Sequence, residues 1–255
     1  MVNLSVNINK IATLRNARGS NLPNLVQFAE DCERFGADGI TIHPRPDERH
    51  ITTKDVYDLA PIVQTEFNIE GYPDERFMSL IKEVKPKQAT LVPDAPGVLT
   101  SDNGWDIAKN KELLTKTIQD LRSLGVRSSI FVNADNDSMH LARMINTDAI
   151  EFYTGPFAQD FEKDPYMAVE KYVHAAEIAH SLGLRINAGH DLNLKNLAFF
   201  KNYVKYLSEV SIGHAIVSDS LYIGIEKAIQ AYKKCLSLSL IHISEPTRRY
   251  AISYA

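Results

Sequence analysis

The chain has 255 residues, 44% hydrophobic and 24% charged, a composition that excludes a disordered polypeptide and fits a folded domain. Its formal net charge of −4 provides no electrostatic basis for binding nucleic acid or an anionic membrane. The sequence contains no apolar run of the roughly 20 residues that span a bilayer, and its start lacks the features of a signal peptide. The two cysteines, Cys32 and Cys235, lie far apart, so we expect a reduced, cytoplasmic protein without a disulfide framework or zinc site.

Eight short segments rich in β-branched or apolar residues predict strands. They are residues 4–9, 39–43, 67–72, 88–93, 128–133, 149–154, 185–190 and 209–217. The longer segments between them repeat apolar residues at three- and four-residue spacing, which predicts helices with one buried face. Examples of these helices are residues 24–37, 75–85, 111–125 and 166–183. Three glycines follow helical segments and predict left-handed residues that end those helices: Gly36, Gly125 and Gly183.

This order of elements predicts an α/β fold, a closed (β/α)8 TIM barrel with additional helices. Nearly continuous apolar strands suit a parallel sheet that is covered on both faces, and eight β–α units in about 240 residues suit a barrel. An open, doubly wound sheet is the alternative, but no GxGxxG motif follows the first strand. We predict a single domain over residues 1–236, since residues 237–255 are serine-rich and lack a helical period.

Reactive side chains gather at the predicted ends of the strands, where barrel enzymes place their active sites. Four of the eight histidines lie at or just past such an end: His43, His50, His190 and His214. Each could be a hydrogen-bonded structural residue, whereas histidines that share a rim with a carboxylate would form an acid–base set. Glu70 ends a run that should be buried, so its carboxylate must be paired, reached by solvent or raised in pKa.

The cations near these strand ends favour an anion over a metal ion. Arg18 lies in the loop after the first strand and Arg45 after the second, and guanidinium groups suit phosphate. The pattern after the second strand is His-x-Arg rather than His-x-His, and an arginine repels a metal cation. Gly189 and Gly213 could simply form turns, or their backbone N–H groups could approach a phosphate near strands seven and eight.

Five motifs together resemble the pyridoxine 5′-phosphate synthase family, in order and at matching spacing from about residue 2 to residue 236. They are VNINKIATLRNARG, ADGITIHPRPDERHI, FNIEG, INAGHDL and SIGHAIV. The resemblance implies a (β/α)8 barrel, assembled as an octamer, that uses no metal or organic cofactor. It also implies condensation of 1-deoxy-D-xylulose 5-phosphate with 3-amino-2-oxopropyl phosphate to give pyridoxine 5′-phosphate, phosphate and water.

The resemblance further implies roles for individual residues. His43 and Glu70 would accept protons and His190 would donate one. The residues implied to bind the two phosphorylated substrates are Asn7, Asn9, Lys10, Arg18, Arg45, His50, Thr100, Asp191, Gly213 and His214. In some members Asn9–Lys10 is Asp–His and Asp191 is Gly. Lys10 still supplies a donor, whereas the charge of Asp191 would repel a phosphate unless its side chain turns away or caps a helix.

Two other functions stay open from the sequence. A different phosphate-binding barrel enzyme, an aldolase or an isomerase, is one of them. A Schiff-base aldolase needs a lysine at a strand end, and here Lys10 only follows the first strand. A non-catalytic protein that binds phosphorylated metabolites is the other, although acid–base residues at four strand ends argue against it.

Overall fold

Eight parallel strands pair in chain order, and β1 also pairs with β8, which closes them into a barrel. The computed structural model describes residues 1–94 and 103–237. The strands are β1 (Asn3–Asn7), β2 (Gly39–Ile42), β3 (Glu66–Gly71), β4 (Gln88–Leu91), β5 (Arg127–Val132), β6 (Ala149–Phe152), β7 (Arg185–Gly189) and β8 (Leu207–Ile212). The predicted TIM barrel is therefore confirmed.

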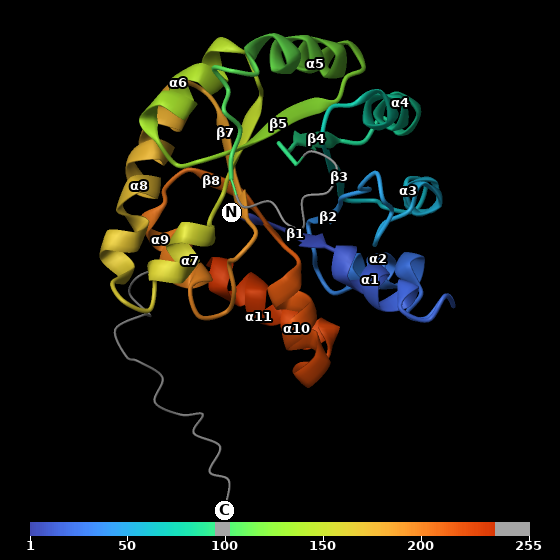
Figure 1. Cartoon of the computed structure of the whole chain (residues 1–255). Coiled ribbons are helices and arrows are strands. Elements are labelled where there is room, and N and C mark those ends of the chain that lie inside the picture. The colour runs from blue at the N-terminus through green and yellow to red at the C-terminus, as the bar shows by residue number, and fades with distance from the viewer. Residues whose placement is uncertain (95–102, 238–255) are drawn as a thin grey trace, which may run out of the picture.

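The helices form a ring around these strands (Figure 1). They are α1 (Asn9–Asn16), α2 (Leu25–Arg34), α3 (Thr53–Leu59), α4 (Glu75–Val84), α5 (Lys111–Ser123), α6 (Asn136–Met144), α7 (Gly155–Asp160), α8 (Pro165–Ser181), α9 (Leu197–Tyr203), α10 (His214–Ile223) and α11 (Ile225–Ser237). Within the described ranges, two helices follow each of β1, β6 and β8, so the predicted additional helices are present.

The two faces of the barrel strands differ in chemistry. Apolar residues such as Leu4, Ile40 and Ile42 are fully buried and belong to the hydrophobic core. Buried polar residues alternate with them, and Ser5 Oγ lies 2.7 Å from Thr41 Oγ1. Hydrogen bonds continue from Asn68 Nδ2 to Thr41 and from the Thr90 hydroxyl to Asn68. The barrel thus carries a network of paired polar groups, as burial of such groups requires.

The predicted helix ends agree with the structure at the three glycines. Gly36, Gly125 and Gly183 have φ angles of 106°, 74° and 76°, in the region that favours glycine. The helices also begin at side-chain caps: Asn24 accepts a hydrogen bond from the backbone of Gln27, and Asp74 accepts one from Phe77.

The predicted eighth strand, residues 209–217, is wrong at its end. β8 runs from Leu207 to Ile212, and α10 begins at His214. Ile216 and Val217 are buried on this helix, so the apolar run continues from the strand into the inner face of a helix. A short apolar run does not distinguish these two structures. For the same reason Asn9, predicted to end the first strand, begins α1.

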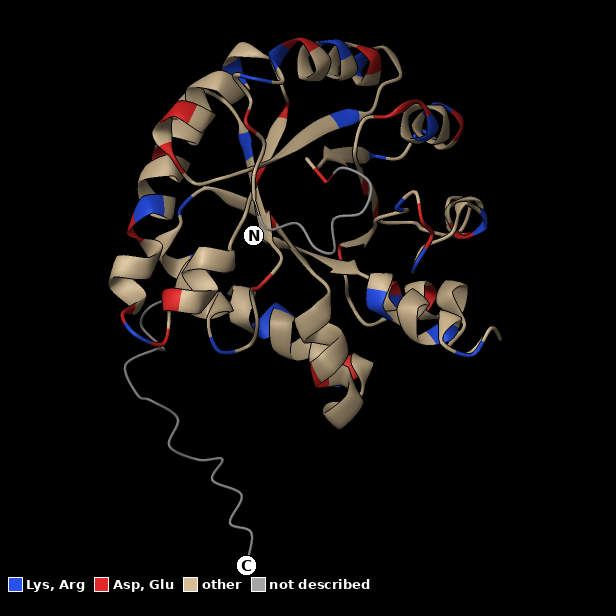
Figure 2. Cartoon of the chain, viewed as in Figure 1, with Lys and Arg blue, Asp and Glu red and all other residues tan. Residues whose placement is uncertain are grey.

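Lysine and arginine alternate with aspartate and glutamate over the outer helices (Figure 2). This mixture fits the small net charge of the chain. None of the helices in the described ranges has the length and apolar character that crossing a bilayer requires.

Candidate active site

A cavity of about 510 Å³ lies at the C-terminal ends of the strands. Each of the eight strands, or the loop directly after it, contributes at least one lining residue. Most residues singled out in the sequence line it: Asn7, Asn9, Lys10, His43, Arg45, His50, Glu70, His190, Asp191, Gly213 and His214. The structure therefore brings together side chains that are far apart in the chain, because each lies where a barrel strand ends.

One predicted residue, Arg18, does not line this cavity. It lies in the turn after α1 and is exposed. Its neighbour Arg15 instead forms a salt bridge with Asp55, with 2.5 Å between Nη1 and Oδ1. Thr100 lies outside the described residues. The substrate-binding roles of Arg18 and Thr100 stay predictions.

The two asparagines near the end of β1 hold other parts of the site. Asn9 Oδ1 accepts a hydrogen bond from the backbone N–H of His43 at 2.9 Å. Asn7 Oδ1 accepts one from the Asn9 backbone, and Asn7 Nδ2 donates to Glu70 Oε2 at 3.4 Å. These amides connect β1 to the ends of β2 and β3, so they fix the relative positions of His43 and Glu70.

His43 and Glu70 form an acid–base pair in the cavity, with 3.8 Å between His43 Nδ1 and Glu70 Oε2. Burial, followed by the charge of Arg45, lowers the pKa of His43 well below its ordinary value. Burial, followed by the charge of Asp94, raises the pKa of Glu70 to about 8, against the opposing effect of Arg45. Near neutral pH this histidine is neutral and able to accept a proton.

Positively charged groups collect on the side of the cavity formed after β2. Burial, followed by the charges of Arg45, Arg49 and Lys10, lowers the pKa of His50 to about 4. Arg45 Nη2 lies 2.6 Å from Asp94 Oδ2, and both side chains are buried. Asp94 therefore fixes the arginine in one direction. Cations held at one wall of a cavity form a site for an anion such as phosphate.

The N-terminus of α10 forms the part of the rim after β8, next to the end of β1. Gly213 caps this helix and His214 begins it, and both line the cavity. A β-carbon on Gly213 would lie 3.1 Å from the Asn7 side chain, so the backbone passes close to β1 here. The N–H groups at a helix start point along its axis and favour a negative group.

Two charged residues that line the cavity, Glu151 and Arg49, received no predicted role from the sequence. Glu151 is 4% exposed, and burial together with the charge of Glu70 raises its pKa to about 8, against the opposing effect of His190. Glu151 lies inside an apolar run, which is the same signal that singled out Glu70. Arg49 lies in the segment between Arg45 and His50, and only the fold shows that it reaches the cavity.

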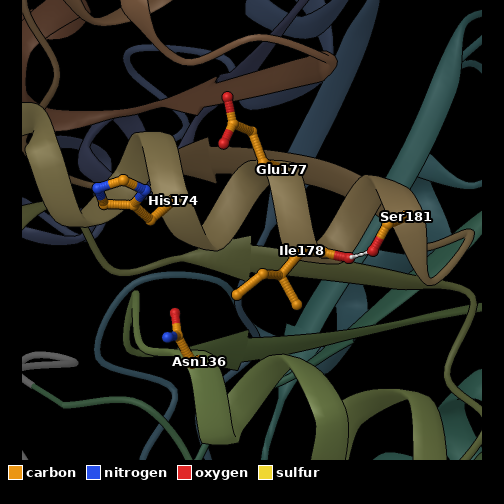
Figure 3. A pocket seen from close by; sticks show the side chains of 5 residues that line it. All are labelled: Asn136, His174, Glu177, Ile178 and Ser181. Atoms are coloured by element: carbon orange, nitrogen blue, oxygen red, sulfur yellow. Dashed lines mark hydrogen bonds between the residues drawn. The ribbon is translucent and has the colours of Figure 1, made fainter.

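A second hollow lies on the outer surface, between α6 and α8 (Figure 3). It is lined by Asn136, His174, Glu177, Ile178 and Ser181. None of the predicted site residues contributes to it. Its histidine and glutamate lie on the same helix and face solvent, whereas the barrel cavity combines buried acid–base groups from several strands.

The fold and this cavity define a TIM-barrel protein whose strand ends carry buried acid–base groups beside cations. The chain belongs to the family described as pyridoxal phosphate biosynthesis protein PdxJ, whose family model matches residues 4–238. It is 57% identical over 238 residues to a pyridoxine 5′-phosphate synthase of Porphyromonas gingivalis, which covers 93% of this chain and 100% of the relative. It is 55% identical over 236 residues to the enzyme of the same name from Bacteroides fragilis, with 92% and 100% covered.

Solved structures of other proteins share the fold. Phosphoribosylanthranilate isomerase from Thermotoga maritima superposes with a TM-score of 0.58 at 12% identity, over 92% of this chain and 98% of that one. Tryptophan synthase from Mycobacterium tuberculosis superposes with a TM-score of 0.62 at 10% identity, over 93% of both chains. At such low identity the likeness concerns the barrel alone.

Proposed function

We propose that this chain is a pyridoxine 5′-phosphate synthase. It would condense 1-deoxy-D-xylulose 5-phosphate with 3-amino-2-oxopropyl phosphate to give pyridoxine 5′-phosphate, phosphate and water. Membership of the PdxJ family and the names of its close relatives support this activity. The observation that carries the proposal is the single cavity in which His43, Glu70 and His190 meet cationic side chains.

The chemistry of this reaction needs groups that accept and donate protons near neutral pH. An amine must condense with a ketone, a phosphate must leave, and a ring must close. His43 would accept a proton as a neutral imidazole, because its pKa is lowered. Glu70, with a pKa raised to about 8, is a stronger base than an ordinary glutamate and would accept protons from the reacting carbons. His190 would donate a proton to the departing group.

Two anionic substrates need two separate anchors. Lys10 on α1, together with Arg45 and Arg49 after β2, would bind one substrate, and the N-terminus of α10 would bind the phosphate of the other. Holding two small molecules in register can lower a reaction barrier by roughly 7–11 kcal/mol in well-oriented cases. We infer that positioning supplies most of the rate and that the titratable groups supply the rest.

The direct test is to mix the purified full-length chain with both substrates and to follow the pyridine absorbance and the mass of the product. We expect pyridoxine 5′-phosphate and inorganic phosphate in equal amounts. The Glu70→Gln variant is the matched control for trace contamination by a host enzyme. A folded wild-type sample that forms no pyridine product would contradict the proposal.

The aldolase alternative has one specific feature in its favour, because Lys10 lines the cavity. A lysine that forms a Schiff base with a carbonyl substrate is fixed irreversibly by borohydride. We expect no borohydride-dependent mass increase on Lys10 with either substrate. A stable adduct at this lysine would favour the aldolase over the synthase.

The same proposal extends to assembly and location. We propose that the chain assembles as an octamer and acts in the cytoplasm without a metal or organic cofactor. In the described part of the chain, no three His, Cys, Asp or Glu side chains come together in a group that could hold a metal ion. The absence of a metal requirement stays a prediction, to be checked by assaying the enzyme after treatment with a chelator.

A further inference from the structure

Asp191 follows His190 directly, and the two side chains contact each other at the mouth of the cavity. Asp191 Oδ2 lies 2.7 Å from His190 Nδ1. The side chain of His190 is 34% exposed and that of Asp191 is 42% exposed, so solvent reaches the pair. A charge-assisted hydrogen bond of this length is among the stronger polar contacts of proteins.

The backbone around this pair is held in an uncommon conformation. His190 has a φ of 62°, in the left-handed region that residues with a β-carbon seldom adopt. The carbonyl of Asp191 accepts hydrogen bonds from the Asn193 and Asn196 side-chain amides, at 3.4 and 3.3 Å. These contacts fix the turn after β7. They place the imidazole and the carboxylate side by side. A backbone conformation as uncommon as that of His190 is often found at functional sites.

Several groups face the His190 ring from neighbouring elements. Glu151 comes from β6 and Asp94 from the loop after β4, and the Tyr153 ring meets the imidazole edge-on at 5.8 Å between centroids. Burial alone would lower the pKa of His190. The hydrogen bond and charge of Asp191, followed by the charges of Glu151 and Asp94, outweigh burial and raise this pKa. Of these groups, Asp191 meets the ring directly, through its hydrogen bond with Nδ1.

We propose that Asp191 is a positioning residue, which orients the His190 imidazole through Nδ1 and keeps it protonated as the proton donor of the reaction. Nε2 is then the ring nitrogen that transfers the proton to the substrate. This inference rests on the proposed synthase function for the identity of the acceptor. The resemblance implied instead that Asp191 binds a substrate. A carboxylate beside a phosphate would repel the phosphate, which favours the positioning role.

The first test needs no catalysis. The C2 proton of a histidine ring exchanges with deuterium at a rate that depends on whether the ring is protonated. Peptide mass spectrometry measures this rate at each histidine as a function of pH and so gives a titration curve for each one. We expect the His190 curve of Asp191→Asn to move to lower pH than in the wild type. The curve of His174, on the outer surface (Figure 3), should stay in place. An unmoved His190 curve would overturn the inference.

The second test is kinetic. A His190 with a higher pKa stays protonated to higher pH, so loss of Asp191 should move the alkaline limb of the kcat profile to lower pH. We expect kcat of Asp191→Asn to fall about tenfold at pH 8 and to approach the wild-type value at lower pH, with KM nearly unchanged. Asp191→Glu should recover part of the loss. Asp160→Asn, an exposed site on α7, is the control for the loss of one carboxylate.

The two tests separate the possible failures. A raised KM with an unchanged pH profile would make Asp191 a substrate ligand and overturn the positioning role. A wild-type enzyme that forms no pyridine product would refute the proposed function. The exchange experiment would still decide whether Asp191 controls His190.

Discussion

At the scale of single residues, burial acts in opposite directions on the acids and the base of the cavity. It raises the pKa values of Glu70 and Glu151 to about 8, and it lowers that of His43. Both effects favour the uncharged form, because a charge is costly to hold in a buried site. Near neutral pH the cavity thus combines a neutral imidazole with carboxyl groups of which a fraction is ionised and can accept a proton. With pKa values of about 8, Glu70 and Glu151 can each take up or release a proton near neutral pH.

The first prediction concerns Glu70, whose carboxylate should be needed for turnover. Glu70→Gln keeps the shape of the side chain and an oxygen that can accept from Asn7 Nδ2, so the site should stay folded. We expect kcat to fall by roughly 10²–10⁴-fold, the usual contribution of a general acid or base. Calorimetric binding of 1-deoxy-D-xylulose 5-phosphate should change little.

The matched control is Glu75→Gln, an exposed glutamate in the first turn of α4. It makes the same chemical change five residues away and should leave kcat at the wild-type value. A Glu70→Gln enzyme with normal turnover would remove Glu70 from the mechanism.

At the scale of elements, the strands and their ends could be predicted because alternation with helices leaves few arrangements. Once the barrel is assumed, residues at the strand ends must share a rim, which is why His43, Glu70 and His190 could be assigned to one site. Contacts across that rim could not be predicted. Asp94 follows β4 and was assigned no role, yet it is the buried partner of Arg45. Such a pair depends on side-chain directions that only the packed barrel defines.

The turn after β7 shows the same limit. The sequence places Asp191 beside His190 but does not say whether its carboxylate faces a phosphate, a helix or the imidazole. The direction of the Asp191 carboxylate depends on the left-handed φ of His190. This φ could not be predicted from the sequence, because histidine rarely adopts that conformation. Similarly, α10 could not be separated from β8, since one apolar run serves both elements.

The second prediction concerns β8, where Glu209 is 1% exposed and lies 3.7 Å from Arg185. Burial, followed by the charge of Glu66, raises its pKa to about 8. Between the ordinary glutamate pKa and about 8, Glu209 is protonated in the folded chain but ionised in the unfolded chain. The stability that protonated Glu209 contributes to the folded chain is therefore lost as the pH rises through about 8. Glu209→Gln should therefore be more stable than the wild type at pH 9, by about 2–4 °C in Tm.

Thermal unfolding followed by circular dichroism between pH 6 and pH 9 checks this prediction. The loss of Tm with rising pH should be smaller in Glu209→Gln than in the wild type. Glu75→Gln should lose as much Tm as the wild type, because its carboxylate is exposed. Equal losses in all three proteins would show that Glu209 is ionised in the folded state throughout this range.

At the scale of the whole molecule, the closed barrel makes the site depend on every strand. Cations come from the segment after β2, acids from β3 and β6, and the proton donor from the loop after β7. Loss of one pairing would separate groups that must act on the same substrate. We therefore expect unfolding of the barrel and loss of activity to coincide, as in a cooperative transition.

The last prediction concerns the end of the chain. The described part of α11 runs to Ser237 and already buries Tyr232 and Leu236 against the core, while residues 237–255 lack a helical period. A chain shortened to residues 1–237 should therefore keep the Tm and kcat of the full chain. Light scattering should give eight copies per particle for both chains. A shortened chain that unfolds at lower temperature would show that the residues removed belong to the domain, and a particle of fewer than eight copies would contradict the proposed octamer.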